Sequence, residues 1–379
     1  MIRPRCSVVI LAVVLAASPA LAQFRAETQL DALYDDNIFN SSTNIADKIL
    51  LGSLGLGFDF DTEKSYTQLY YRGVFSYFTT VTERTFSYHS TGLEYSRLFG
   101  ETERTLLTAG ALYNVRANRD AYSYYDFGQL GFYGNIRHDF TDAVRIRIGY
   151  NFRMFDFREL QEFNYLEHYG FAQLTFMLPT RTTLILEADL GSKTYSNALV
   201  QVDSSGMGMG PRSATESRIV PRVVQFVGIV RLGQSLTETT GFSATGMFLH
   251  DLEKINHYLS SDYGYISDDE VFDDHYAYEG YQLDLVLTQM ITDNTSIKAL
   301  VGFQERQYPG WTVTDAAGTI IAEDRLDRRK AMSLRLTHYL EALDAELYLD
   351  YLRIFNDSND WYFDYTNTAL SVGVSVPLR

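Results

Sequence analysis

The segment "VRIRIGYNFR" (Val144–Arg153) alternates apolar and polar side chains one residue at a time. Valine, isoleucine, tyrosine and phenylalanine occupy every second position, and three arginines, a glycine and an asparagine occupy the positions between them. Successive side chains of a β-strand point to opposite faces of the sheet. The segment therefore predicts a strand with one apolar face and one polar face.

The same period of two recurs along the whole chain. Further alternating runs begin near residues 24, 50, 69 and 130, and the last run, Leu370–Leu378, reaches the C-terminus. No segment sustains the 3.6-residue period of an amphipathic helix. The sequence therefore predicts an all-β chain in which any helix is local.

The connections between these strands show a second regularity. Short polar turns are predicted at residues 61–64, 100–103, 138–142, 179–182, 233–238, 292–294 and 341–344. The other connections, which are mostly longer, are predicted at residues 35–47, 79–84, 116–124, 156–164, 196–218, 251–274, 308–327 and 356–360. Seven short and eight long connections join about sixteen strands, an even number with both chain ends on the short-turn side.

Long strands with one apolar face favour a membrane barrel over a soluble β-sandwich. The predicted strands have roughly 11 to 15 residues, whereas strands of soluble sheets have about five or six. In lipid, every backbone polar group must be paired within the protein, and a closed sheet meets this requirement. We therefore predict a transmembrane antiparallel β-barrel in the outer membrane, with short periplasmic turns and longer extracellular loops. A soluble β-rich periplasmic protein is the alternative.

Tyrosines gather near the ends of the predicted strands, where an amphipathic ring sits well at the level of the lipid headgroups. Examples of these girdle candidates are Tyr71, Tyr77, Tyr278 and Tyr281. The alternative for tyrosines that face inward, such as Tyr70 and Tyr278, is an aromatic platform on which sugars stack.

Residues 1–22 have the features of a cleaved signal peptide. Arg3 and Arg5 form a positive head, residues 7–17 form a short apolar stretch, and Ala20–Ala22 is a small-residue cleavage signal. The mature chain is predicted to begin at Gln23 and to form a single barrel domain over residues 23–379. Cys6 is the only cysteine and lies in the removed segment, so the mature chain has no disulfides.

The charge of the chain restricts its partners. The formal net charge is -16, and removal of Arg3 and Arg5 changes it to -16 - 2 = -18. Such acidity argues against nucleic acid as a partner. The seven histidines match no nucleophile or metal-ligand spacing, so we predict no catalytic residue, no metal site and no cofactor. The acids within residues 251–274 indicate solvated loop charge, with a divalent-cation site as the alternative.

Alternation also assigns polar side chains to an inward face that lines an aqueous lumen. The candidate lumen and selectivity residues are Arg72, Arg137, Arg145, Arg147, Arg153, Glu187, Asp189 and Arg335. The arginines between Arg137 and Arg153 predict a basic patch that faces acids elsewhere and orients polar solutes in a transverse field. The alternative is a ladder of salt bridges between strands that stiffens the wall.

The first predicted strand ends in "YDDNIF", which comprises Tyr34, Asp35, Asp36, Asn37, Ile38 and Phe39. Aspartate and asparagine favour turns, so the chain is expected to leave the first strand here at the outer rim. Ile38 and Phe39 would then tuck against the barrel wall or into its mouth. A loop that constricts the pore is the alternative.

With the signal peptide and the acidic, aromatic-rich strands, this motif resembles the outer-membrane β-barrel porin 2 family. The resemblance implies an outer-membrane barrel with a pore, and a conduit for sugar polymers, since some members are encoded with exopolysaccharide export systems. Outer-membrane barrels usually end in an aromatic residue, whereas this chain ends in Leu378 and Arg379. Recognition by the assembly machinery would then use the alternation of Leu370–Leu378.

The predicted function is a porin-like channel for polar solutes and a conduit for exported polysaccharide. A non-conducting structural or adhesion barrel is one alternative, and an outer-membrane hydrolase is another. The expected partners are outer-membrane lipid and lipopolysaccharide, the barrel assembly machinery and components of polysaccharide export.

Overall fold

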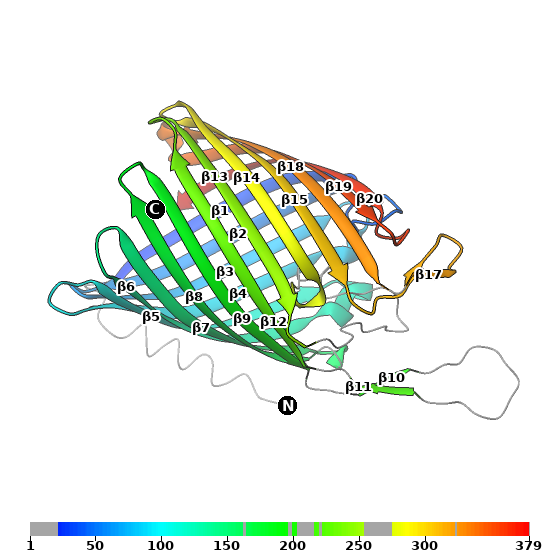
Figure 1. Cartoon of the computed structure of the whole chain (residues 1–379). Helices are drawn as coiled ribbons and strands as arrows, with labels where there is room; N and C mark the ends of the chain where they lie inside the picture. Colours follow the sequence, from blue (N-terminus) through cyan, green and yellow to red (C-terminus); the bar gives the residue numbers. More distant parts are fainter. Residues whose placement is uncertain are drawn as a thin grey trace, which may run out of the picture.

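Sixteen strands close into a single antiparallel barrel (Figure 1). The structure is a computed structural model that describes residues 22–161, 164–195, 199–202, 216–219, 222–253, 275–322 and 324–378. Each strand pairs with its neighbours in the barrel sequence, and β1 closes the ring by pairing with β20 from Ala26↔Leu378 to Asp35↔Ala369. The predicted transmembrane barrel of about sixteen strands is confirmed.

The barrel strands are long and nearly equal in length. They are β1 (Ala22–Asp35), β2 (Asp47–Asp61), β3 (Ser65–Phe78), β4 (Phe86–Phe99), β5 (Thr105–Asn118), β6 (Phe127–Asp139), β7 (Val144–Phe157), β8 (Tyr165–Leu178), β9 (Thr182–Tyr195), β12 (Val223–Ser235), β13 (Thr240–Asp251), β14 (Glu279–Thr292), β15 (Thr295–Tyr308), β18 (Arg325–Leu340), β19 (Ala345–Ser358) and β20 (Tyr365–Leu378). Seven short turns alternate with eight longer connections around the ring, as the sequence predicts.

The remaining elements lie in the connections. Two small sheets are formed by β10 (Leu199–Val202) with β11 (Glu216–Ile219) and by β16 (Val313–Thr314) with β17 (Ile320–Ala322). The short 3₁₀ helices are η1 (Thr82–Arg84), η2 (Asp120–Tyr125), η4 (His275–Ala277) and η5 (Glu341–Leu343). In the part of the chain that the structure describes, no helix is long and apolar enough to span a membrane.

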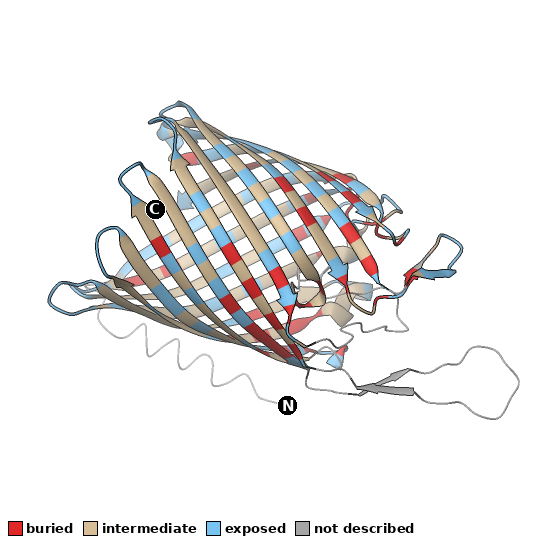
Figure 2. Ribbon diagram, viewed as in Figure 1, coloured by how far each residue is buried: buried red, intermediate tan, exposed pale blue. Residues whose placement is uncertain are grey.

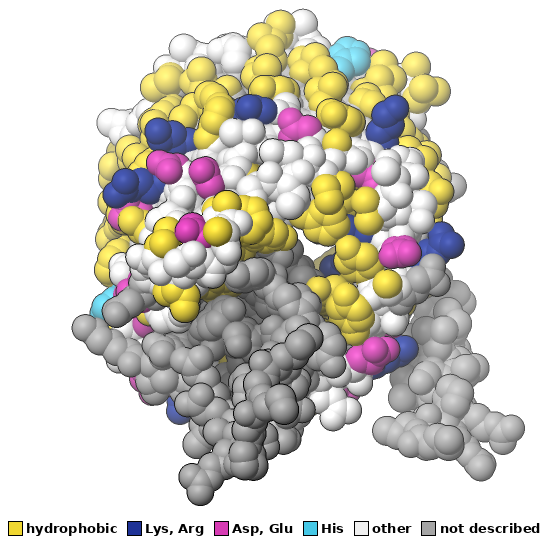
Figure 3. Space-filling model, turned by 90° about the vertical axis from the view of Figure 1, so that its right-hand side faces the viewer, with side chains coloured by type: hydrophobic (Ala, Val, Ile, Leu, Met, Phe, Trp, Pro, Cys, Tyr) yellow, Lys and Arg dark blue, Asp and Glu magenta, His cyan; other side chains and the backbone are white. Residues whose placement is uncertain are grey.

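The two faces of the barrel wall differ as the period of two predicts. On β7, Ile148, Tyr150 and Met154 point outward and are exposed, and Ile148 is 54% exposed. The opposite face of β7 carries the ion-pairing Arg145 and Arg153, and the alternation of burial is visible along the strands in Figure 2. Hydrophobic side chains also form the outer edge of the molecule when it is viewed from the end with the longer loops (Figure 3). This apolar outer surface suits lipid, and the closed sheet leaves no strand edge unpaired. The protein is therefore an outer-membrane barrel.

Apolar clusters join the long loops to the inner wall at the extracellular end. Trp311 and Phe363, from two different loops, pack with Val227 and Leu249 of the wall. The guanidinium of Arg325 lies over the Phe363 ring, with its Cζ atom 3.3 Å from the ring centroid. A second cluster contains Phe127, Phe155, Phe157, Leu160 and Tyr165, with Tyr124 and Tyr125 of η2 packed against it. These loops are thus anchored inside the mouth of the barrel.

The tyrosine girdle predicted from the sequence is only partly correct. Tyr71, Tyr77 and Tyr281 stand on the outward-facing positions of their strands. Tyr278, in contrast, is 3% exposed and belongs to the apolar cluster around Trp311. Its assignment to a girdle was wrong, because Tyr278 lies on the inner side of the wall, the alternative that the sequence left open, and packs there with Tyr308 and Trp311.

Candidate functional site: the barrel lumen

All eight candidate lumen residues stand on the polar face of their strands. Arg72 is on β3, Arg137 on β6, the three arginines 145, 147 and 153 on β7, Glu187 and Asp189 on β9, and Arg335 on β18. The register pairs Arg137 with Arg147 directly across β6 and β7. The structure thus brings Arg137, Arg145 and Arg147 together, while Arg72, Arg153 and Arg335 lie on other parts of the wall.

Arg137, Arg145 and Arg147 form a basic patch around a single carboxylate, Asp139. Both Arg145 and Arg137 reach Asp139, and the Arg137 Nη2–Asp139 Oδ2 distance is 3.9 Å. Arg147 donates to Asn135 Oδ1 at 3.0 Å and lies over the Phe171 ring. Three cations and one carboxylate give this basic patch a formal charge of about +2.

The opposite wall is acidic. Counted around the sixteen-strand ring, β19 is the eighth strand from β7 and so lies directly across the lumen. Glu346 and Asp350 of β19, with Glu27 and Asp31 of β1, form what we term the acidic wall. Its cations are Arg335 and Lys298, which face each other in the register. Four carboxylates against two cations leave a formal negative excess on this side of the lumen.

Salt bridges between neighbouring strands also line the lumen, one of them within the acidic wall. Arg335 binds Asp350 in a bidentate arrangement, at 2.5 Å from Nε and 2.6 Å from Nη2. Arg153 Nη2 donates to Glu167 Oε1 at 2.6 Å. Arg231 Nη1 approaches Glu187 Oε2 at 3.2 Å. The lumen therefore contains both arrangements that the sequence left open: ladders at these three arginines and an unbalanced charge at the basic patch.

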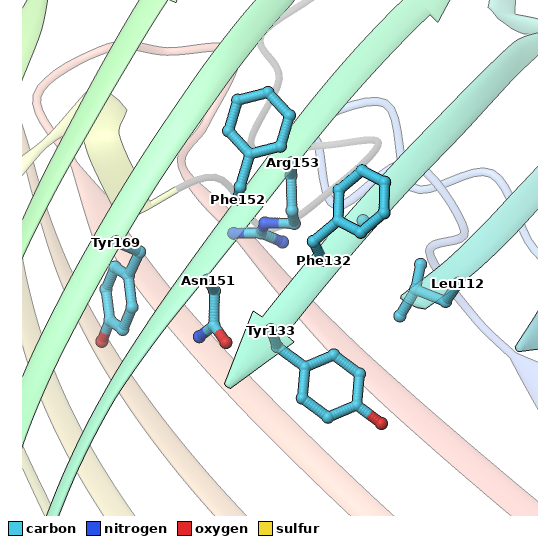
Figure 4. A pocket seen from close by; sticks show the side chains of 8 residues that line it. Leu112, Phe132, Tyr133, Asn151, Phe152, Arg153 and Tyr169 are labelled. Atoms are coloured by element: carbon cyan, nitrogen blue, oxygen red, sulfur yellow. The ribbon is translucent and has the colours of Figure 1, made fainter. Parts of the chain in front are cut away.

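A pocket of about 360 Å³ opens in the inner wall between β5 and β8. We call it the wall pocket. Its lining residues are Leu112, Gly131, Phe132, Tyr133, Asn151, Phe152, Arg153 and Tyr169. Figure 4 shows the Arg153 guanidinium beside the Asn151 amide, with Tyr133 and Tyr169 on either side. Of these residues, only Arg153 was a candidate from the sequence.

Tyrosine rings lie flat against the inner wall beside glycines of the neighbouring strand. The Tyr133 ring occupies the space above Gly110, where an added Cβ would lie 2.3 Å from Cζ. Tyr70 covers Gly92, and Tyr348 covers Gly373, in the same way. A larger residue at these glycines would displace the ring. The sequence signal for such a ring is an inward tyrosine that pairs with a glycine of the neighbouring strand. This signal can be used only when the strand register is known.

The "YDDNIF" motif builds the seam at which the barrel closes. The Asp35 carboxylate accepts from the Asn37 N–H at 2.8 Å and from Asn367 Nδ2 at 3.0 Å. Asp36 accepts from the Thr368 N–H at 2.6 Å. These bonds tie the loop after β1 to β20, its partner across the closure. The motif thus links the first and the last strands at the outer rim.

The side chain of Ile38 anchors the loop after β1 inside the mouth of the barrel. It packs with the inward-facing side chains Ile49 and Phe78, and Phe39 packs against the same cluster. Arg84 Nη1 donates to the Ile38 carbonyl, and its guanidinium lies over the Phe39 ring. The motif therefore combines a rim turn with an apolar anchor at the inner wall.

Replacement of Asn37 by alanine is expected to destabilise the seam. Asn37 is fully buried, and its Nδ2 donates to the Ser41 carbonyl at 2.7 Å and the Thr366 carbonyl at 3.1 Å. Each buried partner left without a donor costs about 1 to 3 kcal/mol. Urea titration of refolded protein should show at least this loss in the free energy of unfolding. Ile45→Ala, an exposed position in the same loop, should change it by about 0.5 kcal/mol or less. Equal losses for both variants would show that the seam network contributes nothing.

Several predicted features lie outside the described residues. They include residues 1–21 of the signal segment, the acids between residues 262 and 274, and the "DSSGMGMGPRS" segment at residues 203–213. Within the residues that are described, no group of three or more His, Cys, Asp or Glu side chains is placed to hold a metal ion.

No family model and no curated protein matches this sequence. Solved outer-membrane barrels match its fold. The chain is similar to OccAB1 of Acinetobacter baumannii, with a TM-score of 0.54 and 9% identity, over 94% of this chain and 97% of that one. It is similar to the outer membrane protein opdK of Pseudomonas aeruginosa, with a TM-score of 0.51 and 10% identity, over 94% and 99%. It is also similar to OpdQ of Pseudomonas aeruginosa, with a TM-score of 0.51 and 10% identity, over 94% and 100%.

At these identities the likeness shows a shared barrel fold. The barrel that the resemblance of residues 34–39 implied is therefore confirmed, while the porin 2 family and its link to exopolysaccharide stay predictions. The chain has the fold of a sixteen-stranded outer-membrane β-barrel.

Proposed function

We propose that this protein is a porin-like channel that lets polar solutes cross the outer membrane. The observation that supports this proposal most directly is the charge arrangement of the lumen, in which the basic patch on β6 and β7 faces the acidic wall on β19 and β1. A wall that only needed stiffening would balance its charges in pairs, as Arg335 and Asp350 do. A charge excess on each side orients polar solutes and raises the local concentration of ions.

Within that role, the finer proposal is a conduit for exported polysaccharide. The resemblance of residues 34–39 supports it, and so does the Tyr133 ring that lies against the inner wall. The partners proposed with this role are outer-membrane lipid and lipopolysaccharide, the assembly machinery and components of polysaccharide export. The selectivity residues proposed are the eight lumen candidates, with the basic patch contributing most. No catalytic role is assigned to any residue.

Reconstitution into planar lipid bilayers tests the channel. Purified, refolded protein should give discrete conductance steps in potassium chloride, because about sixteen strands enclose an aqueous lumen. A folded barrel migrates differently from the heated chain in semi-native electrophoresis, which provides the folding control. Folded protein that never conducts would contradict the channel and favour a structural or adhesion barrel.

A further inference from the structure

The wall pocket combines aromatic rings with the hydrogen-bonding side chains of Asn151 and Arg153. Tyr133 and Tyr169 supply the rings, and both hydroxyls are held by carboxylates. The Tyr133 hydroxyl donates to Glu94 Oε2 at 2.7 Å, and the Tyr169 hydroxyl donates to Asp189 Oδ2 at 2.6 Å. A tethered ring is fixed in orientation, so little side-chain entropy is lost when a ligand packs on it.

Two buried acceptors beside the wall pocket have no hydrogen-bond partner. Asp189 is 1% exposed, and its Oδ1 has none, although its other oxygen binds Tyr169. Asn114, the next inward residue after Leu112 on β5, also has an Oδ1 without a partner. Neither atom belongs to the lining of the wall pocket, and both are closed off from solvent, so the pocket's own hydrogen-bonding groups are the Asn151 amide and the Arg153 guanidinium.

The charge near the wall pocket does not favour an anion. Arg153, its only charged lining residue, is already paired with Glu167 at 2.6 Å. Glu94 and Asp189 add two further carboxylates through their bonds to the pocket tyrosines. Lys193 faces Glu167 in the register. Three carboxylates against two cations disfavour an acidic ligand, in contrast to the basic patch.

We propose that the wall pocket is a binding subsite for a neutral sugar unit of an oligosaccharide. The C–H face of a sugar ring is apolar and packs on the electron-rich face of a tyrosine, while its hydroxyls hydrogen-bond to the Asn151 amide of the lining. The volume of about 360 Å³ lies in the range of small-ligand sites. This inference rests on the proposed channel, because the sugar must enter the lumen to reach the subsite.

The affinity of the subsite for a neutral sugar can be measured as the block of the channel current by maltohexaose in planar bilayers. The half-blocking concentration should rise about three- to tenfold in Tyr133→Leu, the loss expected for one aromatic contact. Tyr133→Phe keeps the ring and should stay within about twofold of the parent. Tyr348→Leu is the matched control, since Tyr348 covers Gly373 as Tyr133 covers Gly110 but lies on the opposite wall. It should also stay within about twofold.

Further measurements separate this subsite from the channel itself. An acidic hexagalacturonate should block more weakly than maltohexaose, and stronger block by the acidic sugar would overturn the neutral-sugar assignment. Conductance without block by maltohexaose would overturn the subsite while the channel stands. If the protein did not conduct, calorimetric titration of maltohexaose into detergent-solubilised barrel would still test the subsite. Binding there that is weakened by Tyr133→Leu but not by Tyr348→Leu would support it, and no binding would overturn it. Equal effects of the two leucine variants would overturn it as well.

Discussion

Ile148→Lys is expected to lower the free energy of unfolding by roughly 2 to 4 kcal/mol, because it places a charge on the lipid face of β7. Ile148 is 54% exposed and lies beside Ile136 and Ala172 of the flanking strands. None of these neighbours offers a counter-charge. The lysine would have to extend toward a headgroup region or draw water into the hydrocarbon layer.

Asn151→Lys provides the matched control on the same strand. Asn151 differs from Ile148 by three positions and stands on the opposite, inward face, where water is available. Introducing the same charge there should cost about 1 kcal/mol or less. Denaturant titrations of both variants refolded into lipid vesicles measure the difference. Equal losses would mean that the inward and outward faces have been exchanged.

Double replacement of Arg145 and Arg147 by glutamate should shift the ion selectivity of the channel toward cations. The basic patch carries a formal charge of about +2, from three arginines and Asp139. Each reversal changes the charge by -2, so the patch becomes 2 - 4 = -2. Cations then accumulate near the lumen wall and anions are depleted. The reversal potential in a salt gradient should move accordingly.

A graded series and a salt series test the cause of this shift. Arg145→Gln with Arg147→Gln leaves Arg137 and Asp139, a charge near zero, and should give about half of the shift. Raising the salt from physiological concentration to 1 M shortens the screening length from about 8 Å to about 3 Å and should shrink the effect. Conductance with unchanged selectivity would place these arginines in a wall ladder away from the constriction.

Much of the barrel can be predicted from the sequence because the information is local. Side chains alternate between faces with a period of two, so a run such as Val144–Arg153 specifies both the strand and its two faces. Turn residues mark the seven short connections, which the structure confirms. Two of the predicted turns begin too early by more than one residue. The turn predicted at residues 233–238 spans residues 236–239, because β12 runs to Ser235. The turn predicted to begin at His138 begins one residue after Asp139, so Asp139 is a strand residue whose carboxylate joins the basic patch.

The site could be predicted only in part because its members are distant in the sequence. Alternation identified the arginines of β7 as candidate site residues. It did not identify Tyr133, Asn151 and Tyr169, because these inward residues become a site only when the register of four strands brings them around one pocket. Alternation gave an inward position for Tyr278 as an alternative, but not its packing with Trp311 and Phe363 of two other loops. Packing between loops and wall depends on shape, which a hydropathy pattern does not contain.

By itself, the sequence determined the strands, their two faces and the order of short and long connections, because each of these follows from neighbours within a few residues. It therefore also determined the closed barrel, because every backbone group in lipid must be paired. Only the tertiary structure decided which residues meet. Asn37 binds the carbonyl of Thr366, 329 positions away, and β7 faces β19 across the lumen. Such encounters are fixed by ring closure and register, which are properties of all sixteen strands together.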